Sequence, residues 1–268
     1  MSEQPYAKKS LGQHWLNDKA TLEDICDAAE LDGADMILEI GPGPGSLTKL
    51  LVQEVKKVIA VEFDERFAKA LLSNVNAKNL EVTHEDILKF DLTSLPKDYK
   101  VVANIPYYLT SNLLRVLSES TNPPQTIVLL IQKEVAERVA AKPGDMSLLS
   151  VSVQLYYQAN LGVKVPAHLF SPPPKVDSQV LVLKRRGGEL FPDVTEQQIL
   201  TVVKAGFSAR RKTLLNSLSA GLRQDKPQIT ESLQAAQLDP AKRPQELSLE
   251  DWYRLTKVLT NDSPALNT

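Results

Sequence analysis

The sequence predicts an α/β protein with a mostly parallel sheet flanked by helices, followed by a small all-α domain. Between residues 36 and 131, short apolar runs alternate with amphipathic segments, as in successive βαβ units. A turn rich in glycine and proline follows the first apolar run, where parallel sheets bind ligands. After residue 185, apolar residues recur at helical spacing. We therefore expect a large domain over 1–185 and a helical domain over 186–268.

The composition is that of a soluble globular protein, with 43% hydrophobic and 24% charged residues in 268. No apolar run approaches the roughly 20 residues that span a bilayer, and the first residues lack the apolar segment of a signal peptide. Cys26 is the only cysteine, which excludes an intrachain disulfide and a cysteine-cluster metal site. We expect a cytoplasmic protein that binds neither metal nor membrane.

The segment 8–18 has no periodicity and combines two lysines, a glycine and a tryptophan. It is either a lid or contact arm, or a loop packed on the core by Trp15 and Leu16. A helix capped by Asn17 or Asp18 is expected to follow it. The buried side of this helix would consist of Leu22, Ile25, Cys26 and Ala29.

The pattern predicts six strands, at 36–40, 58–61, 80–83, 101–103, 126–131 and 179–183. Right-handed crossover helices at 47–55 and 67–72 would join the first three. The segment 147–158 is ambiguous, because alternating apolar residues favour a strand whereas Ser147 would cap a helix. Three consecutive prolines in 171–175 exclude both helix and sheet ladder there.

The helical domain is predicted from its capping residues. Thr195 would cap a helix that runs through Val203, and Ser208 a basic helix containing Leu214 and Leu218. A further helix is expected at 229–236. Ser248 and Asp251 would form a capping box at the start of the last helix.

The most informative segment is Asn104-Ile105-Pro106-Tyr107, which follows the fourth strand. Pro106 lacks an N–H group and restricts the residue before it, so the strand must end here. An amide next to an aromatic ring at this edge of the sheet suits a flat, polar group such as a nucleobase. The alternative is an ordinary turn between a strand and a helix.

Three features at the ends of successive strands suit one adenosine-shaped ligand. Gly41 and Gly43 belong to a G-x-G-x-G turn whose prolines remove N–H donors, which favours a nucleoside without phosphates. Glu62, 21 residues after Gly41, is placed to bind both ribose hydroxyls. Asp86 would accept a hydrogen bond from the adenine amino group. Each acid alone could be a surface charge, but together they indicate S-adenosylmethionine.

Basic residues are concentrated between residues 204 and 226, where six cations face one acid, a net charge of +5 in a chain of net charge −2. Such a segment either binds nucleic-acid phosphates or forms a solvated helix face. Charge alone leaves both alternatives open.

Seven motifs in order resemble the ribosomal RNA adenine dimethyltransferase family, and within it the bacterial KsgA branch. They lie at 8–16, 39–45, 61–64, 104–107, 132–135, 170–178 and 208–213. The resemblance implies a class I methyltransferase fold with a seven-stranded sheet, and it makes 147–158 a helix. Trp15 stands where relatives more often have phenylalanine. The cofactor contacts that the resemblance implies fall on His14, Leu16, Gly41, Glu62, Asp86 and Asn104.

The resemblance implies dimethylation of N6 of two adjacent adenosines near the 3′ end of 16S rRNA. The Asn104 side-chain oxygen and the Ile105 carbonyl would each accept one N–H bond and so direct the nitrogen lone pair at the methyl group. Tyr107 would stack on the flipped base, and Phe170 would close its other face unless it only packs its own loop.

The expected partner is 16S rRNA within an immature small ribosomal subunit, bound by a monomer. Basic residues on both sides of the domain boundary would contact phosphates; they are Lys133, Arg138, Arg210, Arg211 and Lys212. One alternative is a 23S rRNA dimethyltransferase of the macrolide-resistance type. Another is a ribosome-assembly factor whose binding role outweighs catalysis.

Overall fold

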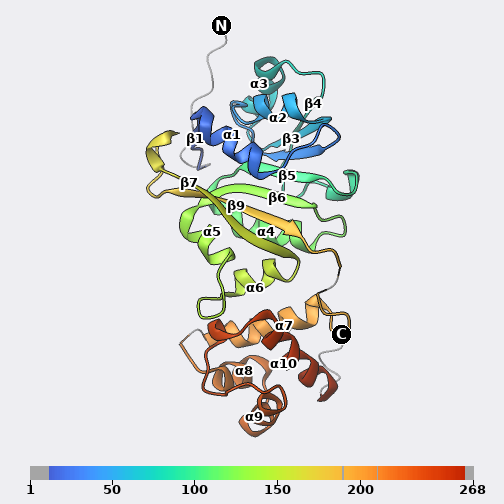
Figure 1. The fold of residues 1–268 in the computed structure, drawn as a ribbon, viewed down its shortest axis with the longest axis vertical. Coiled ribbons are helices and arrows are strands. Elements are labelled where there is room, and N and C mark those ends of the chain that lie inside the picture. Colours follow the sequence, from blue (N-terminus) through green and yellow to red (C-terminus); the bar gives the residue numbers. More distant parts are fainter. Residues whose placement is uncertain (1–11, 189, 210, 263–268) are drawn as a thin grey trace. The chain divides into compact units, whose positions relative to one another are not determined.

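The computed structural model describes residues 12–188, 190–209 and 211–262. The chain divides into two compact units, and each is described by itself (Figure 1). The first unit consists of Met1–Ala136 and Gln158–Arg185. The second consists of Glu137–Tyr157 and Arg186–Thr268. A helical segment from the middle of the chain is therefore part of the C-terminal unit.

A seven-stranded sheet forms the centre of the first unit, in the order β4-β3-β2-β5-β6-β9-β7. Its strands are β2 (Met36–Ile40), β3 (Lys57–Glu62), β4 (Leu80–His84), β5 (Lys100–Asn104), β6 (Thr126–Gln132), β7 (Tyr157–Val165) and β9 (Ser178–Arg185). The β2–β3, β3–β4, β2–β5 and β5–β6 pairs are parallel, and β9 is antiparallel to β6. The predicted mostly parallel sheet is confirmed, and β7 is a strand whose position the sequence did not reveal.

Helices cover the sheet because the side chains on both of its faces are apolar. These helices are α1 (Lys19–Ala28), α2 (Thr48–Glu54), α3 (Glu65–Val75) and α4 (Thr110–Glu119). The helix α5 (Lys133–Val139) begins in the first unit and ends in the second. Ile25 of α1 and Leu51 of α2 share a buried cluster with Ile37 and Val102 of the sheet. Asp18 caps α1 as expected, accepting a hydrogen bond from the Thr21 N–H. Among the described residues, no helix combines the length and apolarity needed to cross a membrane.

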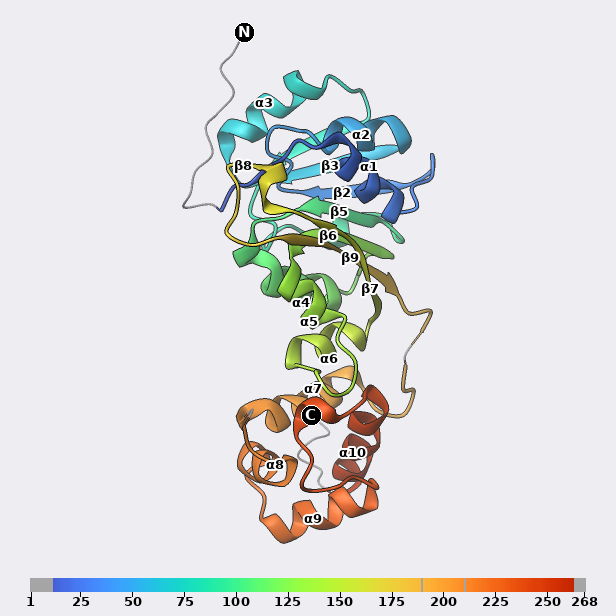
Figure 2. The same ribbon diagram turned by 60° about the vertical axis from the view of Figure 1, so that its left-hand side comes forward.

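The N-terminal segment is held by a second, two-stranded sheet. β1 (Trp15–Leu16) pairs antiparallel with β8 (Phe170–Ser171), which lies beside it in Figure 2. Leu16 and Phe170 are opposite each other and are both buried in the core cluster. The packed-loop interpretation of Leu16 is therefore confirmed, whereas residues 8–11 lie outside the described residues.

The second unit is helical and has its own core. It contains α6 (Leu148–Gln154), α7 (Glu196–Gly206), α8 (Leu214–Leu222), α9 (Lys226–Ala235) and α10 (Leu249–Asp262). The indole of Trp252 is fully buried, and a Cβ added at Gly206 would lie 2.4 Å from it. Capping boxes begin α6 at Ser147 and α7 at Thr195, and Ser248 exchanges hydrogen bonds with Asp251. The helical interpretation of the ambiguous segment is confirmed for Leu148–Gln154, but its expected end is wrong, because strand β7 begins at Tyr157.

The predicted start of the basic helix is wrong. α8 begins at Leu214 with Thr213 in the capping position, five residues after Ser208. Ser208 instead lies in the short 3₁₀ helix η5 (Phe207–Ala209), where its hydroxyl donates to the Ser217 carbonyl oxygen. Arg211 and Lys212 consequently lie in the turn before the helix and are exposed.

Candidate cofactor and substrate site

A pocket opens at the carboxyl ends of β2, β3 and β5, where the sequence predicts the ligand. The N-terminal segment closes one side of it. Its lining residues are Gly12, Gln13, His14, Trp15, Leu16, Leu22, Glu39, Gly41, Pro42, Gly43, Pro44, Ser46, Leu47, Glu62, Phe63, Asp64, Asn104, Ile105, Pro106, Tyr107 and Tyr108. Most of the predicted cofactor and catalytic residues are therefore gathered at one place.

The turn after β2 requires glycine because its backbone is in a conformation that side chains disfavour and because a side chain there would have little room. Gly41 and Gly43 have φ values of +65° and +54°, in the left-handed region that side chains disfavour. A Cβ added at Gly43 would also lie 3.2 Å from the Trp15 indole nitrogen. The Gly41 N–H continues the ladder by donating to the Val61 carbonyl at 2.9 Å. The turn therefore presents its backbone directly to the pocket.

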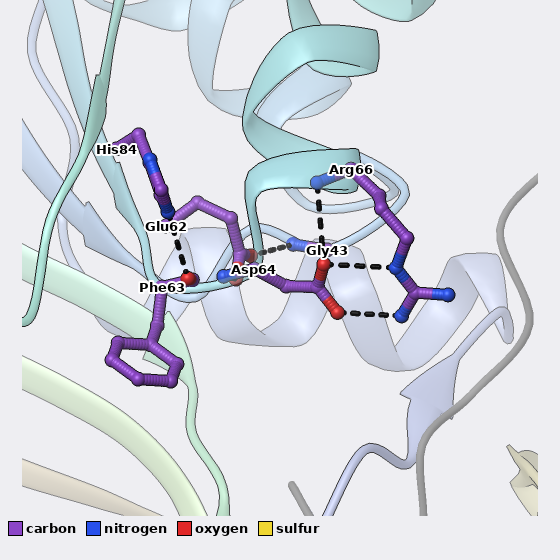
Figure 3. A network of polar contacts seen from close by, with 6 residues as sticks. All are labelled: Gly43, Glu62, Phe63, Asp64, Arg66 and His84. Atoms are coloured by element: carbon purple, nitrogen blue, oxygen red, sulfur yellow. Dashed lines mark hydrogen bonds and ion pairs between the residues drawn. The ribbon is translucent and has the colours of Figure 1, made fainter.

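Glu62 is held by two backbone N–H groups (Figure 3). Its Oε2 accepts from Gly43 at 3.0 Å and its Oε1 from Asp64 at 2.8 Å. Burial raises the pKa of the Glu62 carboxyl, and these two hydrogen bonds oppose that rise. The carboxylate has a fixed orientation, and its remaining lone pairs can accept hydrogen bonds from ribose hydroxyl groups.

Asp64 makes a separate ion pair next to Glu62. Arg66 donates to Asp64 through its backbone N–H, its Nε and its Nη2, as Figure 3 shows. The guanidinium also lies 5.6 Å from the Phe67 ring centroid. The negative charge of Asp64, which caps the start of α3, is thus balanced by Arg66. Glu62 has no cation among the contacts drawn in Figure 3.

Asn104 ends β5 with its amide oriented by the N-terminal segment. Its Nδ2 donates to the His14 carbonyl oxygen at 3.1 Å. No described residue donates to its Oδ1, so that oxygen is the acceptor available to a ligand. The following residue, Ile105, is buried. The geometry therefore supports the predicted acceptor role of Asn104.

His14 links three parts of the site. Its Nδ1 lies 2.7 Å from the Pro172 carbonyl oxygen. A carbonyl only accepts, so Nδ1 is the donor in this contact. The ring stacks on that of Tyr107, with centroids 5.9 Å apart and planes inclined by 25°. The Tyr107 hydroxyl lies 2.7 Å from the Ser178 Oγ, so this ring is fixed at both ends.

The sequence did not reveal three of the lining residues as candidates. Phe63 and Tyr108 are large aromatic side chains that are 58% and 65% exposed at the pocket. Nothing in the sequence distinguishes them from packed aromatics. Glu39 is 1% exposed, and burial raises the pKa of its carboxyl to about 8. Its signal was available, since Glu39 is the only polar residue of an otherwise apolar strand.

Two predicted site residues lie away from the pocket lining. Asp86 is in the loop after β4, and its Oδ1 accepts from the Leu88 N–H at 3.0 Å. Phe170 is 4% exposed in the core cluster with Leu16, so the structure favours its packing alternative. Among the described residues, no group of three or more His, Cys, Asp or Glu side chains is arranged to hold a metal ion.

The predicted RNA-binding residues belong to different units. Lys133 begins α5 in the first unit and is half-buried, whereas Arg138 is exposed in the second unit. Arg211 and Lys212 are exposed in the second unit, and Arg210 lies outside the described residues.

Comparison with known proteins places these features in a family context. The family model described as ribosomal RNA adenine dimethylase matches residues 5–261. A ribosomal RNA small subunit methyltransferase A from Dehalococcoides mccartyi is 41% identical over 93% of this chain and 87% of its own. The protein of that name from Geobacillus thermodenitrificans is 39% identical, over 94% of this chain and 90% of its own.

Two solved structures share the fold over most of the chain. A dimethyladenosine transferase from Plasmodium falciparum has a TM-score of 0.78 and 29% identity, covering 92% of this chain and 98% of its own. The 23S rRNA methyltransferase ErmE has a TM-score of 0.74 and 29% identity, covering 92% of this chain and 99% of its own.

Proposed function

The chain belongs to the ribosomal RNA adenine dimethylase family, and from this premise we propose its reaction. It transfers methyl groups from S-adenosylmethionine to N6 of two adjacent adenosines near the 3′ end of 16S rRNA. The observation that carries this proposal is the Asn104 amide, whose nitrogen is held by His14 so that its oxygen is left to accept. Relatives named for the small subunit, at about 40% identity, support 16S rRNA as the substrate.

The residues of the pocket fit S-adenosylmethionine, which would supply an electrophilic methyl group. Glu62, fixed by two N–H groups, would bind the ribose hydroxyls. The backbone at Gly41 and Gly43 leaves space for the ligand, and His14 and Leu16 would contact it from the N-terminal segment. Asp86 would reach the adenine amino group from the loop after β4.

Asn104 and Ile105 would prepare the target amine. An exocyclic adenine nitrogen is a weak nucleophile because its lone pair is delocalised into the ring. If the Asn104 Oδ1 and the Ile105 carbonyl each accept one N–H bond, that lone pair is directed out of the ring plane towards the methyl group. The same oxygens stabilise the positive charge that develops on nitrogen, and the extra proton then leaves to solvent.

The aromatic residues would hold the extruded base. Tyr107 offers a ring already fixed by His14 and Ser178, and stacking contributes about 1–3 kcal/mol per base. Tyr108, 65% exposed beside it, is available to a neighbouring base. Arg211 and Lys212, together with Lys133, Arg138 and Arg210, would bind backbone phosphates of an immature small subunit. We expect the protein to act as a cytoplasmic monomer.

The reaction is tested by incubating the protein with labelled S-adenosylmethionine and either undermethylated small subunits or large-subunit rRNA, and then mapping the methyl groups. Label on the two adjacent adenosines of 16S rRNA is expected. Label confined to large-subunit rRNA would contradict the substrate assignment and favour a reaction like that named for ErmE.

The role of Asn104 gives a sharper prediction. Asn104→Ala should keep RNA binding and lose methyl transfer by about 10²-fold or more, because it removes an acceptor aimed at developing charge. Filter binding and single-turnover transfer would be measured side by side. Asn112→Ala, at an exposed position of α4 outside the pocket lining, is the matched control and should leave both unchanged. Full activity of Asn104→Ala would refute the positioning argument.

A further inference from the structure

A groove on the first unit lies apart from the cofactor pocket, at the amino ends of the strands. Residues from the starts of β3 and β4 and from the last turn of α3 line it; they include Lys56, Lys57, Leu72, Lys78 and Val82. The cofactor pocket opens at the carboxyl end of β3, whereas the groove includes its first residue. The two ends of β3, Lys57 and Glu62, are about 16 Å apart at about 3.3 Å per residue. The groove is therefore a separate surface of the same unit.

The fold holds two lysines side by side at this groove. Val58 of β3 and Leu80 of β4 are register partners, and the Val58 N–H donates to the Asn79 carbonyl oxygen at 2.9 Å. Lys56 and Lys78 each lie two residues before these partners, so the two lysines enter the sheet together. The Asn79 side chain fixes the approach, because it donates to two carbonyl oxygens at the end of α2, each at 2.9 Å.

The groove has a positive charge that the protein itself does not offset. Its lining contains three lysines against one acid, Glu81, whose carboxylate pairs with Lys57 at 2.6 Å. Among the described residues, Lys56 and Lys78 have neither an ion pair nor a side-chain hydrogen bond, and both are exposed. Like charges on neighbouring strands repel each other, which disfavours this arrangement unless an anion lies between them. The chain as a whole has a net charge of −2, so the excess is local.

The strand beside the lysines has a free edge. β4 is the edge strand of the sheet and pairs only with β3 in the part of the chain that the structure describes (Figure 1). Backbone N–H groups on a free edge and lysine ammonium groups are both donors that suit phosphate oxygens. Leu72 of α3, which is 50% exposed, adds an apolar wall against which a sugar ring can pack.

We propose that this groove binds the phosphate backbone of a second segment of ribosomal RNA, away from the strand that enters the pocket. The inference rests on the proposed function, which supplies a folded RNA as the partner. A nucleotide whose base lies in the pocket cannot place its own phosphate in the groove, because the two lie at opposite ends of β3. The groove adds affinity for the folded small-subunit RNA and carries no sequence information, since phosphate contacts position a protein without specifying bases.

The double variant Lys56→Gln/Lys78→Gln tests the proposal by removing both charges. Its binding to undermethylated small subunits would be measured by filter binding between about 50 and 200 mM salt. The slope of log K against log salt should fall by about 1.4–1.8, because each phosphate contact contributes about 0.7–0.9. Each single variant should show about half of this fall. An unchanged slope in the double variant would overturn the proposal.

A matched control removes two charges elsewhere. Lys49→Gln/Lys97→Gln alters two exposed lysines that do not line the groove, and it should keep the slope of the unmodified protein. In the groove variant, KM for the subunits should rise while kcat stays unchanged, since the contact is the same in the ground state and the transition state. Retained S-adenosylmethionine binding shows that the first unit is folded.

A footprint identifies the RNA segment. Hydroxyl-radical cleavage should reveal a backbone segment that the unmodified protein protects and the double variant does not, while protection around the two target adenosines persists. A double variant that weakens all protections equally would refute a separate contact.

Two further results would assign the groove differently and overturn the proposal. If the lysines only prevent β4 from pairing with another chain, the double variant should self-associate in sedimentation while its RNA binding is unchanged. If the groove takes a protein segment, the salt dependence of binding to protein-free 16S rRNA should not change. Failure of the unmodified protein to bind or methylate rRNA would instead contradict the proposed function.

Discussion

The buried Glu39 carboxyl predicts an unusual dependence of stability on pH in the cofactor-free protein. Its pKa is 4.5 when exposed and about 8 in the folded state. A folded pKa raised above the unfolded value means that the protonated acid stabilises the fold below pH 4.5. This stability is lost as the pH rises through 8.

The size of the effect follows from the shift. One pKa unit corresponds to 1.36 kcal/mol, so the difference between 4.5 and about 8 amounts to about 5 kcal/mol at high pH. Most of the loss, about 4 kcal/mol, falls between pH 5 and pH 9. Because domains are stable by only about 5–15 kcal/mol, such a loss is easily measured.

Glu39→Gln removes the titrating group and keeps the side-chain shape. The free energy of unfolding of this variant should exceed that of the unmodified protein increasingly from pH 5 to pH 9. Urea unfolding followed by circular dichroism at each pH measures the difference. Glu62, whose pKa is also raised by burial, is present in both proteins, but its charge is one cause of the raised Glu39 pKa, so the measured difference reports the coupled pair. Parallel curves over this range would refute the reasoning, and exposed Glu54→Gln should give such a parallel curve.

Substitutions at three further positions test other parts of the structure. Asp18→Ala should lower the free energy of unfolding by about 1 kcal/mol in urea, since Asp18 caps α1 through the Thr21 N–H; an unchanged value would contradict the cap. Tyr107→Phe loses the hydrogen bond with Ser178, about 1 kcal/mol of stability, but should keep transfer within a few-fold because the ring remains; Tyr107→Ala should lose transfer. Lys212→Ala should reduce the salt dependence of RNA binding, log K against log salt, by about 0.7–0.9, whereas an unchanged slope would exclude a phosphate contact.

Much of the fold could be predicted because buried parallel strands leave a clear record in sequence. Four strands are short apolar runs that fit few structures other than a buried strand; they are β2, β3, β5 and β6. β7 was missed because most of its residues are exposed or half-buried, so no apolar run marks it. The start of α8 was misplaced because Ser208 and Thr213 are both plausible caps, and only the packing of the helix decides between them.

The site could be predicted at positions where a residue type at the end of a strand has few structural roles other than ligand binding. Gly43, Glu62 and Asn104 are such residues, and the pocket brings them together. Glu39 was missed because a single acid in a strand usually faces solvent, and its burial depends on the helices above it. The role of Phe170 stayed open because an aromatic residue beside three prolines is consistent with either a lid or a packed loop, and its burial favours the packed loop.

The position of Asn104 depends on contacts that no local pattern encodes. His14 comes from the N-terminal segment and Pro172 from a loop about 160 residues later, yet their hydrogen bond joins these segments beside the end of β5. Pairing between two-residue strands, with Leu16 opposite Phe170, sets the register of that contact. A shift of one residue would replace the His14 carbonyl and release the Asn104 amide, which could then rotate its oxygen away from the pocket. The buried position of Phe170 therefore bears on the proposed site, since it fixes the strand that orients the Asn104 amide.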